Sequence, residues 1–417
     1  MSQPDVVIFG GGIAGMWLLD ELVRRGREAV LLESNRLGTG QTVSAQGIIH
    51  GGLKYSLAGT TNASAHGVRQ MPSLWRDCLE GRREPDLRAV RIYSPGCYLW
   101  HGRSLGSRLG YLGARLGLEV TPRKLLRQER PPLLADHDGP VAVMDEPVID
   151  TASLLEQLAI RHRQRLFLYD PQRIEWSLVG PGMVRSLWVP HPWDRLPGAG
   201  LRLVPRAVVL TAGAGNASLR NQLGLSAAAM QRRPLHMVVV RGDLPWLCGH
   251  QVDGARTRMT ITSATDSQGR TVWQLGGQVA EDGVAMDRAT LIAHAASELA
   301  EILPGLALAG LEASSYRVDR AEAATAGGRR PGSARVLVSG NTLSAWPTKL
   351  ALAPVLADEI RTALDSLDPV RPASTATGPS RDLAALDWPR PEVARPPWDL
   401  VGNWLPLLAS TTSRKAA

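Results

Sequence analysis

Two short apolar runs near the N-terminus have the character of buried parallel strands. Residues 6–9 and 29–32 are uninterrupted runs of apolar side chains. Strands that are covered on both faces show such runs rather than an alternating pattern. Between them, residues 16–25 carry the apolar spacing of a helix. The pattern therefore predicts a strand–helix–strand unit at the start of the chain.

Comparable patterns recur further along the chain. Helical spacing predicts helices over 63–79, 150–161, 289–303 and 348–364, and Asp150 is a suitable N-cap residue for the second of them. Strands are predicted over 88–100, 166–169, 207–210, 235–240, 257–263, 271–278 and 336–339, and a β-meander over 174–189 and 201–204. The tail from residue 365 is rich in Pro, Ala and Ser, and we expect its apolar segment at 398–408 to pack on the body.

Glycines join the first strand to the first helix. Gly10, Gly12 and Gly15 form the pattern G-x-G-x-x-G directly after the strand. Gly10 permits a tight turn, Gly12 lets a pyrophosphate approach the backbone, and Gly15 allows the helix to pack closely on the strand. Glu33 ends the second strand 23 residues after Gly10, where a carboxylate can accept hydrogen bonds from a ribose. The unit predicts dinucleotide binding, and a Gly-rich turn in another α/β fold is the alternative.

A second glycine turn follows the strand predicted at 207–210. Gly213 and Gly215 resemble the start of another nucleotide fingerprint. Ser218, however, stands where the third glycine would be, and no acidic residue ends a strand about 20 residues later. We therefore interpret this turn as backbone that closes against a cofactor held by the first unit.

Composition indicates a globular chain. It has 417 residues, of which 44% are hydrophobic and 21% are charged, enough for two or three domains. No apolar run approaches the roughly 20 residues that span a bilayer, and no basic segment precedes a signal core, so we expect a cytoplasmic protein. Cys78, Cys97 and Cys248 are widely spaced and form no metal pattern. We expect buried thiols and no metal site.

The net charge of +8 is compatible with three kinds of binding partner. A basic chain can attract nucleic acid, an anionic membrane or an anionic substrate. No helix-turn-helix or zinc motif supports binding of nucleic acid, and a solvated basic face is the simplest interpretation. Residues 103–118 mix Arg with Leu, Tyr and Gly, so a peripheral contact with the inner face of a membrane stays open.

Four segments, taken in order, resemble the D-amino-acid oxidase superfamily of FAD-dependent oxidoreductases. The first is the nucleotide unit at 6–33. The second, Ile-Ile-His-Gly-Gly-Leu-Lys-Tyr at 48–55, is similar to the I-H-G-G-L-R-Y segment of FAD-dependent glycerol-3-phosphate dehydrogenases and to a segment of 2-hydroxyglutarate oxidases. The third is the glycine turn at 208–215. The fourth, at 340–354, is similar to the last flavin-contacting helix of the family.

The resemblance implies an α/β fold with a Rossmann-like, glutathione-reductase-like FAD-binding domain and an inserted substrate domain built on an antiparallel sheet. We assign residues 1–80, 145–225 and 333–366 to the FAD-binding domain and residues 81–144 and 226–332 to the substrate domain. Residues 367–417 form a tail packed on the body. With only one full nucleotide fingerprint, the chain has no separate NAD(P)H domain, so the organic substrate is expected to reduce the flavin directly.

FAD is therefore the expected cofactor. Reduced flavin collects charge near N1 and the C2 carbonyl, where a helix N-terminus is favourable, and the helix predicted to begin at Thr348 could supply one. The resemblance and the motifs together predict these FAD contacts: Gly10, Gly12, Ile13, Ala14, Gly15, Glu33, Ser34, Thr42, Ser44, Gln46, Gly47, His50, Gly51, Gly52, Ala212, Gly213, Gly215, Pro347, Thr348, Lys349 and Leu350.

Two histidines are candidate catalytic residues. The family reaction is hydride transfer from a substrate C–H bond to flavin N5, and for an alcohol a base must also accept the hydroxyl proton. The resemblance places the segment of His50 against the flavin ring. His50 is thus the first candidate, as a base, as a covalent flavin attachment or as a structural residue. His236, on a strand that matches the substrate sheet of the family, is the second.

Arg320 is the candidate for binding an anionic group of the substrate. Members of the family that oxidise amino acids often have an Arg-Pro pair at this place, and a bidentate guanidinium suits a carboxylate. Here the pair is Arg320-Ala321. Asp319 and Glu322 could also neutralise Arg320 in a plain ion pair.

These features predict an FAD-dependent dehydrogenase or oxidase. Its substrate would be a small anionic C–OH compound, such as a 2-hydroxy acid or a polyol phosphate. An amine or amino-acid oxidase of the same fold is one alternative. The others are a flavin subunit of a multi-chain electron-transfer dehydrogenase and a binding protein without flavin. The electron acceptor (oxygen, a quinone or a partner protein) and the oligomeric state stay open.

Overall fold

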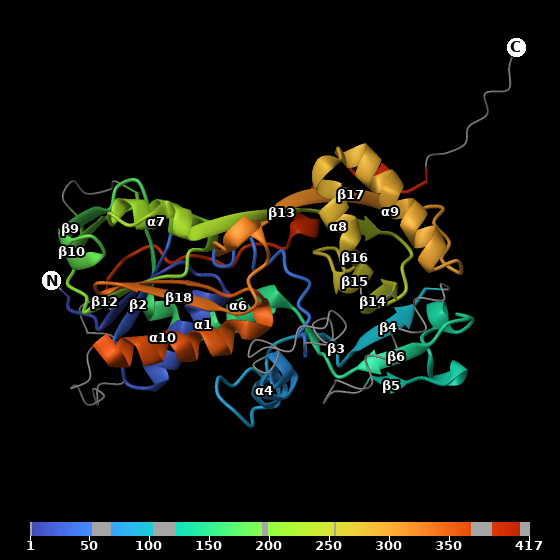
Figure 1. The fold of residues 1–417 in the computed structure, drawn as a ribbon, viewed down its shortest axis with the longest axis horizontal. Helices are drawn as coiled ribbons and strands as arrows, with labels where there is room; N and C mark the ends of the chain where they lie inside the picture. The colour runs from blue at the N-terminus through green and yellow to red at the C-terminus, as the bar shows by residue number, and fades with distance from the viewer. Residues whose placement is uncertain are drawn as a thin grey trace, which may run out of the picture.

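Two large β-sheets organise the molecule. The computed structural model describes residues 2–51, 68–102, 122–193, 199–253, 256–367 and 386–408. One sheet has six strands and the other has nine. Figure 1 shows them in opposite halves of the molecule, with the long strand β13 running from one half toward the other. The basic stretch predicted at 103–118 and residues 63–67 of a predicted helix lie outside the described residues.

The six-stranded sheet has the order β18-β19-β12-β1-β2-β8. All neighbouring strands are parallel except β18 and β19. Strand β1 lies between β2 and β12, so the predicted nucleotide unit and the second glycine turn end at the same edge of the sheet. The strands are β1 (Val6–Phe9), β2 (Ala29–Glu33), β8 (Leu166–Leu168), β12 (Ala207–Leu210), β18 (Arg335–Ser339) and β19 (Thr342–Trp346).

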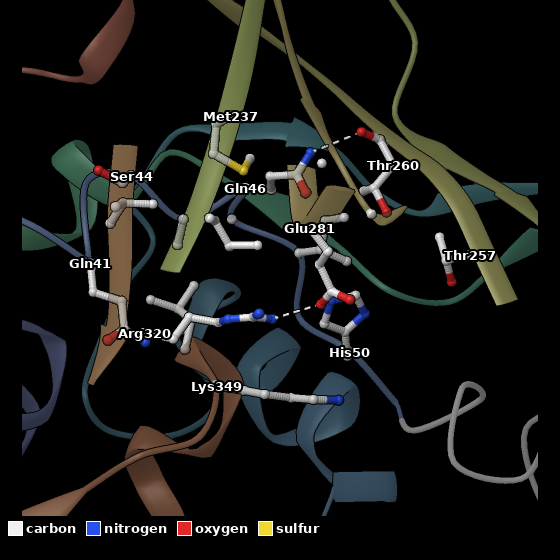
Figure 2. Close-up of a pocket in the computed structure, with 18 of the residues that line it drawn as sticks. Gln41, Ser44, Gln46, His50, Met237, Thr257, Thr260, Glu281, Arg320 and Lys349 are labelled. Atoms are coloured by element: carbon white, nitrogen blue, oxygen red, sulfur yellow. Dashed lines mark hydrogen bonds and ion pairs between the residues drawn. The ribbon is translucent and has the colours of Figure 1, made fainter. Parts of the chain in front are cut away.

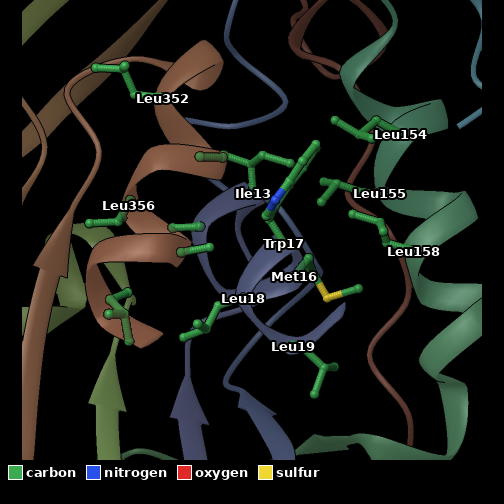
Figure 3. Packing of buried hydrophobic residues seen from close by; sticks show 14 of the residues in the cluster. Ile13, Met16, Trp17, Leu18, Leu19, Leu154, Leu155, Leu158, Leu352 and Leu356 are labelled. Atoms are coloured by element: carbon green, nitrogen blue, oxygen red, sulfur yellow. The ribbon is translucent and has the colours of Figure 1, made fainter. Parts of the chain in front are cut away.

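Helices cover one face of this sheet. They are α1 (Ile13–Arg24), α4 (Met71–Leu79), α6 (Thr151–His162) and α10 (Ala353–Leu367). Figure 3 shows Trp17 of α1 next to Leu155 of α6, while Leu18 points toward Leu356 of α10. Helix α1 is buried on most of its circumference because the sheet and both helices surround it. As predicted, Asp150 caps α6, accepting hydrogen bonds from the N–H groups of its first turn.

A three-stranded antiparallel meander packs on the opposite face of the sheet. It consists of β9 (Glu175–Gly180), β10 (Met183–Pro190) and β11 (Gly200–Leu203), and α7 (Asn216–Gln222) lies beside it. Along β1 the side chains alternate between the two layers: Val6 and Ile8 contact the helices, whereas Val7 and Phe9 contact the meander. This double coverage explains the uninterrupted apolar runs in the sequence.

The nine-stranded sheet has the order β20-β17-β13-β16-β15-β14-β4-β6-β5, and its neighbours are antiparallel except β14 and β4. Helices α8 (Gln278–Asp282) and α9 (Arg288–Ile302) accompany it, and α9 packs on its core. The strands are β4 (Cys97–His101), β5 (Arg123–Lys124), β6 (Val141–Met144), β13 (Met230–Arg241), β14 (Gly249–Asp253), β15 (Arg256–Thr265), β16 (Thr271–Gly276), β17 (Glu312–Ala323) and β20 (Leu405–Pro406). A separate pair joins β3 (Ile92–Ser94) to β7 (Val148–Ile149).

The predicted fold class is confirmed: an α/β nucleotide-binding sheet is combined with a largely antiparallel second sheet. The exact domain limits stay a prediction. In support of them, all six strands of the first sheet fall within 1–80, 145–225 and 333–366, and the strands of the second fall within 81–144 and 226–332, except β20 in the tail.

The helix predicted over 348–364 begins later than expected. A 3₁₀ turn occupies Leu350–Leu352, and α10 starts at Ala353. Pro354 explains the shift, because it has no N–H to donate to the Leu350 carbonyl and its ring would clash there. Proline is tolerated in the first turn of a helix, where that donor is not needed. Thr348 therefore precedes the helix instead of starting it.

The cysteines and two apolar residues of the tail have the burial that the sequence predicts for them. Cys78, Cys97 and Cys248 are buried and form no disulfide, as expected. Trp398 and Leu407 of the tail are buried. Among the described residues, no helix is long and apolar enough to cross a membrane.

Candidate active site

A deep cleft opens at the carboxyl ends of β1, β2 and β12. Ligands of open α/β sheets bind at this edge, where neighbouring strands leave in different directions. The cleft has a volume of about 590 Å³. Most of the predicted cofactor contacts line it, namely Gly10, Gly12, Ile13, Ala14, Glu33, Ser34, Thr42, Ser44, Ala212, Gly213, Gly215, Pro347, Lys349 and Leu350.

The three fingerprint glycines have different structural roles. Gly10 has φ +104°, and a Cβ on it would lie 2.4 Å from the Ala212 Cα. A Cβ on Gly15 would lie 2.0 Å from the Gly10 carbonyl oxygen, so Gly15 permits close packing of α1 on the turn. A Cβ on Gly12 would meet only the Thr42 hydroxyl, at 3.1 Å. The space beside Gly12 therefore belongs to the cleft.

The N-terminus of α1 faces the same space. The Ile13 N–H donates to Thr42 Oγ1 at 3.1 Å, which ties the loop after β2 to the first turn of the helix. The first N–H groups of a helix have no partner within the helix, and together with the macrodipole they favour an anion. This turn fits the pyrophosphate of a dinucleotide.

Glu33 stands at the edge of the cleft. Its Oε2 accepts a hydrogen bond from the Gly11 N–H at 2.6 Å, and its Oε1 accepts one from the Asn35 N–H at 2.8 Å. Burial raises the pKa of Glu33 against the effect of these hydrogen bonds. Tyr169 and Gln222 line the same end of the cleft, and the sequence analysis did not find them because they belong to no motif.

The far end of the cleft contains buried polar atoms that suit a bound ligand. Trp346 Nε1 and Thr348 Oγ1 are buried and have no hydrogen-bond partner among the described residues. Such groups are rare in native structures unless water or a ligand satisfies them. Trp346 lines the cleft, and Thr348 adjoins Pro347 and Lys349, which also line it. These donors and the glycine cradle fit the extended dinucleotide cofactor that the sequence predicts.

A second cavity of about 370 Å³ adjoins the cleft (Figure 2). The two share Gln41, Ser44, Ala45, Val318, Lys349 and Leu350. Gln46, Gly47 and His50, predicted as cofactor contacts, lie on the second cavity together with Arg320. Figure 2 shows Arg320 and Lys349 extending toward the wall that carries His50. We refer to this cavity as the substrate pocket.

The substrate pocket is lined by more cations than acids. The lining includes the side chains of Arg256, Arg320, Arg330 and Lys349, and one carboxylate, Glu281. The sequence analysis missed Arg256, Arg330 and Glu281, which lie at the end of a strand, in a loop and on a five-residue helix. A positively charged cavity of this kind favours an anionic ligand.

Arg320 has a different partner from those that the sequence suggested. Its Nη1 donates to Glu281 Oε1 at 3.1 Å, and its buried Nε has no partner among the described residues. Burial and the neighbouring Arg233 lower the pKa of Arg320. Glu322 instead accepts two hydrogen bonds from Arg233, and Asp319 pairs with Arg232 at 3.6 Å. Arg320 thus lines the pocket with Glu281 as its ion-pair partner within the described part of the chain.

His50 and His236 lie in different environments. His50 lines the substrate pocket, and its Nδ1 is 3.3 Å from Glu146 Oε2. His236 is buried on the other side of β13, where its Nδ1 is 3.0 Å from the Gly283 carbonyl and its Nε2 is 2.8 Å from Ser315 Oγ. Side chains alternate along a strand, and Leu235 and Met237 are the ones that line the pocket. The structure therefore does not bring His236 into the site.

Two further predicted contacts, Gly15 and Gly51, lie outside both cavity linings, and a third, Gly52, lies outside the described residues. Gly15 packs on the nucleotide turn, and the Gly51 N–H donates to Glu146 Oε1 at 2.6 Å. Gly52 lies outside the described residues, as do the residues that follow it in the predicted flavin segment.

The chain is similar to known flavoproteins over nearly its whole length. The family model described as "FAD dependent oxidoreductase" (DAO) matches residues 5–347. The probable FAD-dependent oxidoreductase PA4991 of Pseudomonas aeruginosa is 39% identical over 403 residues, which cover 95% of this chain and 98% of that protein. Its crystal structure superposes with a TM-score of 0.78, covering 96% of this chain and 98% of that one at 38% identity.

Two more distant structures share the fold. Glycine oxidase of Geobacillus kaustophilus has a TM-score of 0.61 at 18% identity and covers 89% of this chain and 99% of its own. The FAD-bound L-α-glycerophosphate oxidase of Mycoplasma pneumoniae has a TM-score of 0.58 at 14% identity, with coverages of 88% and 95%. One is named for an amine substrate and the other for a polyol phosphate.

Proposed function

The chain belongs to the DAO family of FAD-dependent oxidoreductases, and from this premise we propose that it oxidises a small anionic substrate at a C–OH carbon. The substrate would be a 2-hydroxy acid or a polyol phosphate. The observation that carries the proposal is the substrate pocket itself, where Arg320, Lys349 and His50 line one space beside the cofactor cleft. Cations hold the anionic group, and a histidine is suited to accept a hydroxyl proton.

The cleft residues would hold the cofactor along its length. The first turn of α1 and Gly12 would face the pyrophosphate, and Glu33 would accept hydrogen bonds from the ribose. Lys349 and Leu350 line both cavities, so they would lie where the flavin ring meets the substrate. When bound, FAD supplies the acceptor for the hydride that leaves the substrate carbon.

The pocket residues would bind and orient the substrate. The Nε of Arg320 has no partner in the ranges that the structure describes, so the guanidinium can donate to a carboxylate or a phosphate oxygen. His50 would accept the hydroxyl proton as the carbon is oxidised. Leu235 and Met237 line the pocket with apolar surface and exclude water beside the reacting carbon.

Anaerobic bleaching of the flavin spectrum tests this proposal. The purified protein is mixed without oxygen with 2-hydroxy acids, glycerol 3-phosphate and amino acids in turn. Bleaching by a hydroxy acid or by the polyol phosphate supports the proposal. Bleaching by an amino acid alone would instead assign the chain to the amine-oxidising alternative. In that case Arg320 would hold the carboxylate, and His50 would not be needed to accept a hydroxyl proton.

The electron acceptor is a separate question with its own experiment. Reoxidation of the bleached protein by oxygen would indicate an oxidase, and reoxidation by a soluble quinone would indicate a quinone-dependent dehydrogenase. Reoxidation only by a copurifying chain would indicate a flavin subunit of a larger assembly. Membrane contact through residues 103–118 stays a prediction, and vesicle cosedimentation would test it.

A further inference from the structure

We infer that Glu146 is a positioning residue for His50: its buried carboxylate orients the imidazole ring and stabilises the imidazolium that forms when His50 accepts a proton. The inference rests on the proposed function, because it assigns His50 the role of base. Glu146 does not line the substrate pocket and so acts through His50.

Backbone pairing holds Glu146 in place. The Ile149 N–H donates to the Gly47 carbonyl at 3.0 Å, and the Ile49 N–H donates to the Pro147 carbonyl at 2.9 Å. The segment that carries His50 thus runs beside the segment that carries Glu146. The Gly51 N–H then donates to Glu146 Oε1 at 2.6 Å. With one carboxylate oxygen held by the backbone, the other is directed at the ring, 3.3 Å from His50 Nδ1.

Glu146 has His50 as its ion-pair partner among the described residues, and His250 lies within 4.8 Å of the same carboxylate. The Glu146 side chain is 4% exposed, and its one ion-pair partner in this part of the chain is His50. A buried carboxylate without a counter-charge is strongly unfavourable, whereas a buried pair with hydrogen bonds is tolerated. Protonation of His50 creates that pair. The arrangement therefore favours His50 as a proton acceptor.

The contact also selects the tautomer of the neutral ring. A histidine that donates from Nδ1 to a carboxylate carries its lone pair at Nε2. In the proposed reaction the substrate O–H bond breaks and a bond forms between Nε2 and the proton. The O–H electron pair would become the second C–O bond of the carbonyl, and the hydrogen on that carbon would leave with both C–H electrons as a hydride that bound FAD accepts.

His250 restrains the other side of the ring. Its ring lies 5.5 Å from that of His50 at an interplanar angle of 28°, and its Nδ1 is 2.8 Å from Thr260 Oγ1. The ligand atoms of His50, Glu146 and His250 all lie within 4.8 Å of one another, which also suits a metal ion. The distance of 3.3 Å between His50 Nδ1 and Glu146 Oε2, however, already suits a direct hydrogen bond. We therefore favour the proton-accepting arrangement and treat a metal as an outcome of the test.

The test compares Glu146→Gln with Asp145→Asn in the FAD-loaded protein. Glutamine keeps the shape of Glu146 and removes its charge. Asp145 is the adjacent carboxylate, but it is largely exposed and pairs with Arg76, so it serves as the matched control. Other charged groups lining the pocket beside His50 are the same in both variants, namely Arg256, Glu281, Arg320, Arg330 and Lys349.

The first measurement needs no substrate. Long-range ¹H–¹⁵N NMR of histidine-labelled protein reports the tautomer and the pKa of His50, whose signal is assigned by its loss in His50→Gln. We expect Glu146→Gln to lower the pKa of His50 by at least about one unit and to raise the population of the other tautomer. Asp145→Asn should change neither. An unchanged tautomer and pKa in Glu146→Gln would overturn the inference.

The second measurement uses any compound that bleaches the wild-type flavin. We expect Glu146→Gln to lower kcat at least tenfold with little change in KM. The limb of the pH profile on which activity rises with pH should also move to lower pH. Equal kcat values and pH profiles would overturn the inference. If no compound bleaches the wild type, the proposed function fails, while the NMR result still decides the Glu146–His50 relationship. Stoichiometric metal in the wild type that is lost in Glu146→Gln would replace the inference with a metal centre.

Discussion

Gly10 and Ala212 lie so close together that no side chain fits between them. A Cβ on Gly10 would stand 2.4 Å from the Ala212 Cα. The two residues follow β1 and β12, which pair in parallel. The contact therefore joins the nucleotide turn to the second glycine turn and forms the floor of the cofactor cleft.

Gly10→Ala should destabilise the fold itself. The φ of +104° is unfavourable for any side chain, and the new methyl group would overlap backbone that cannot move freely. We expect a loss of at least about 2 kcal/mol of stability, measured as a lower midpoint of urea unfolding in the FAD-free protein. A midpoint equal to that of the wild type would contradict the packing described here.

Gly12→Ala should leave the FAD-free fold nearly intact and reduce FAD binding. Gly12 has φ −74° and ψ −179°, which alanine adopts readily, and its Cβ would contact only Thr42. The methyl group would occupy space that the pyrophosphate needs. We expect at least a tenfold higher Kd for FAD by fluorescence titration. Gly180→Ala is the control, because nothing lies within 4 Å of its new Cβ.

His50→Ala should slow flavin reduction without releasing FAD. Loss of a general base typically costs a factor of about 10² to 10⁴. Stopped-flow bleaching with the active compound measures this step. His236→Gln is the comparison, and its reduction rate should stay within about twofold of the wild type, because both ring nitrogens of His236 contact groups away from the pocket. Equal effects of the two substitutions would refute the assignment.

Arg320 and Glu281 should have opposite effects on substrate affinity. Arg320→Gln removes a charge-assisted contact and should raise KM about tenfold or more. Glu281→Gln removes the acid that competes for the guanidinium, so KM should fall. Steady-state kinetics measures both values. Arg258→Gln is the control, because Arg258 pairs with Glu298 and Glu301, and none of the three lines the substrate pocket.

Asp20 should stabilise the packing of α1 against α6 at neutral pH. Burial alone would raise the pKa of Asp20, but hydrogen bonds from His162 and Arg24 outweigh it and lower the pKa to about 2 from 3.8. A lowered folded-state pKa adds stability above the unfolded-state value, and that stability is lost as pH falls through the folded-state value. Asp20 thus contributes about 2 kcal/mol at neutral pH, which disappears between about pH 4 and pH 2.

Urea unfolding of Asp20→Asn at a series of pH values checks this expected dependence of stability on pH. The variant should be less stable than the wild type at pH 7, and the difference should shrink below pH 4 and nearly vanish by about pH 2. Asp358→Asn is the surface control, because Asp358 forms an exposed ion pair with Arg361 and should contribute less than about 0.5 kcal/mol. A difference between the wild type and Asp20→Asn that grows toward low pH would contradict the prediction.

The local hydrophobic pattern of the sequence was sufficient to predict strands whose buried side chains are apolar. It failed for strands that bury polar side chains. Strands β1, β2 and β12 were predictable because helices cover one face of their sheet and the meander covers the other. Strand β19 was missed because Thr342 and Ser344 interrupt its apolar pattern, yet both are fully buried. Ser344 receives a hydrogen bond from Arg220 Nη1 at 2.7 Å, a partner that no local pattern reveals.

Strand β17 was missed for a related reason. Charged residues such as Arg317, Asp319 and Arg320 indicate a loop when they are considered alone. In the structure they belong to a twelve-residue antiparallel ladder with β13. The same limit applies to the site: His50 could be found from its segment, whereas Glu146, 96 residues away, belongs to no motif and is brought to His50 only by backbone pairing.

The order of strands in the six-stranded sheet has a consequence for protein synthesis. Strand β1 pairs with β12, and residue 207 follows residue 6 by about 200 positions. At about 5 to 20 residues per second, the ribosome needs roughly 10 to 40 s to deliver the partner of β1. During that time the nascent chain presents an apolar strand with an open edge, which is prone to aggregation. Assembly of the cleft also waits for residues 346–350, so the complete FAD cleft can form only after most of the chain has been made.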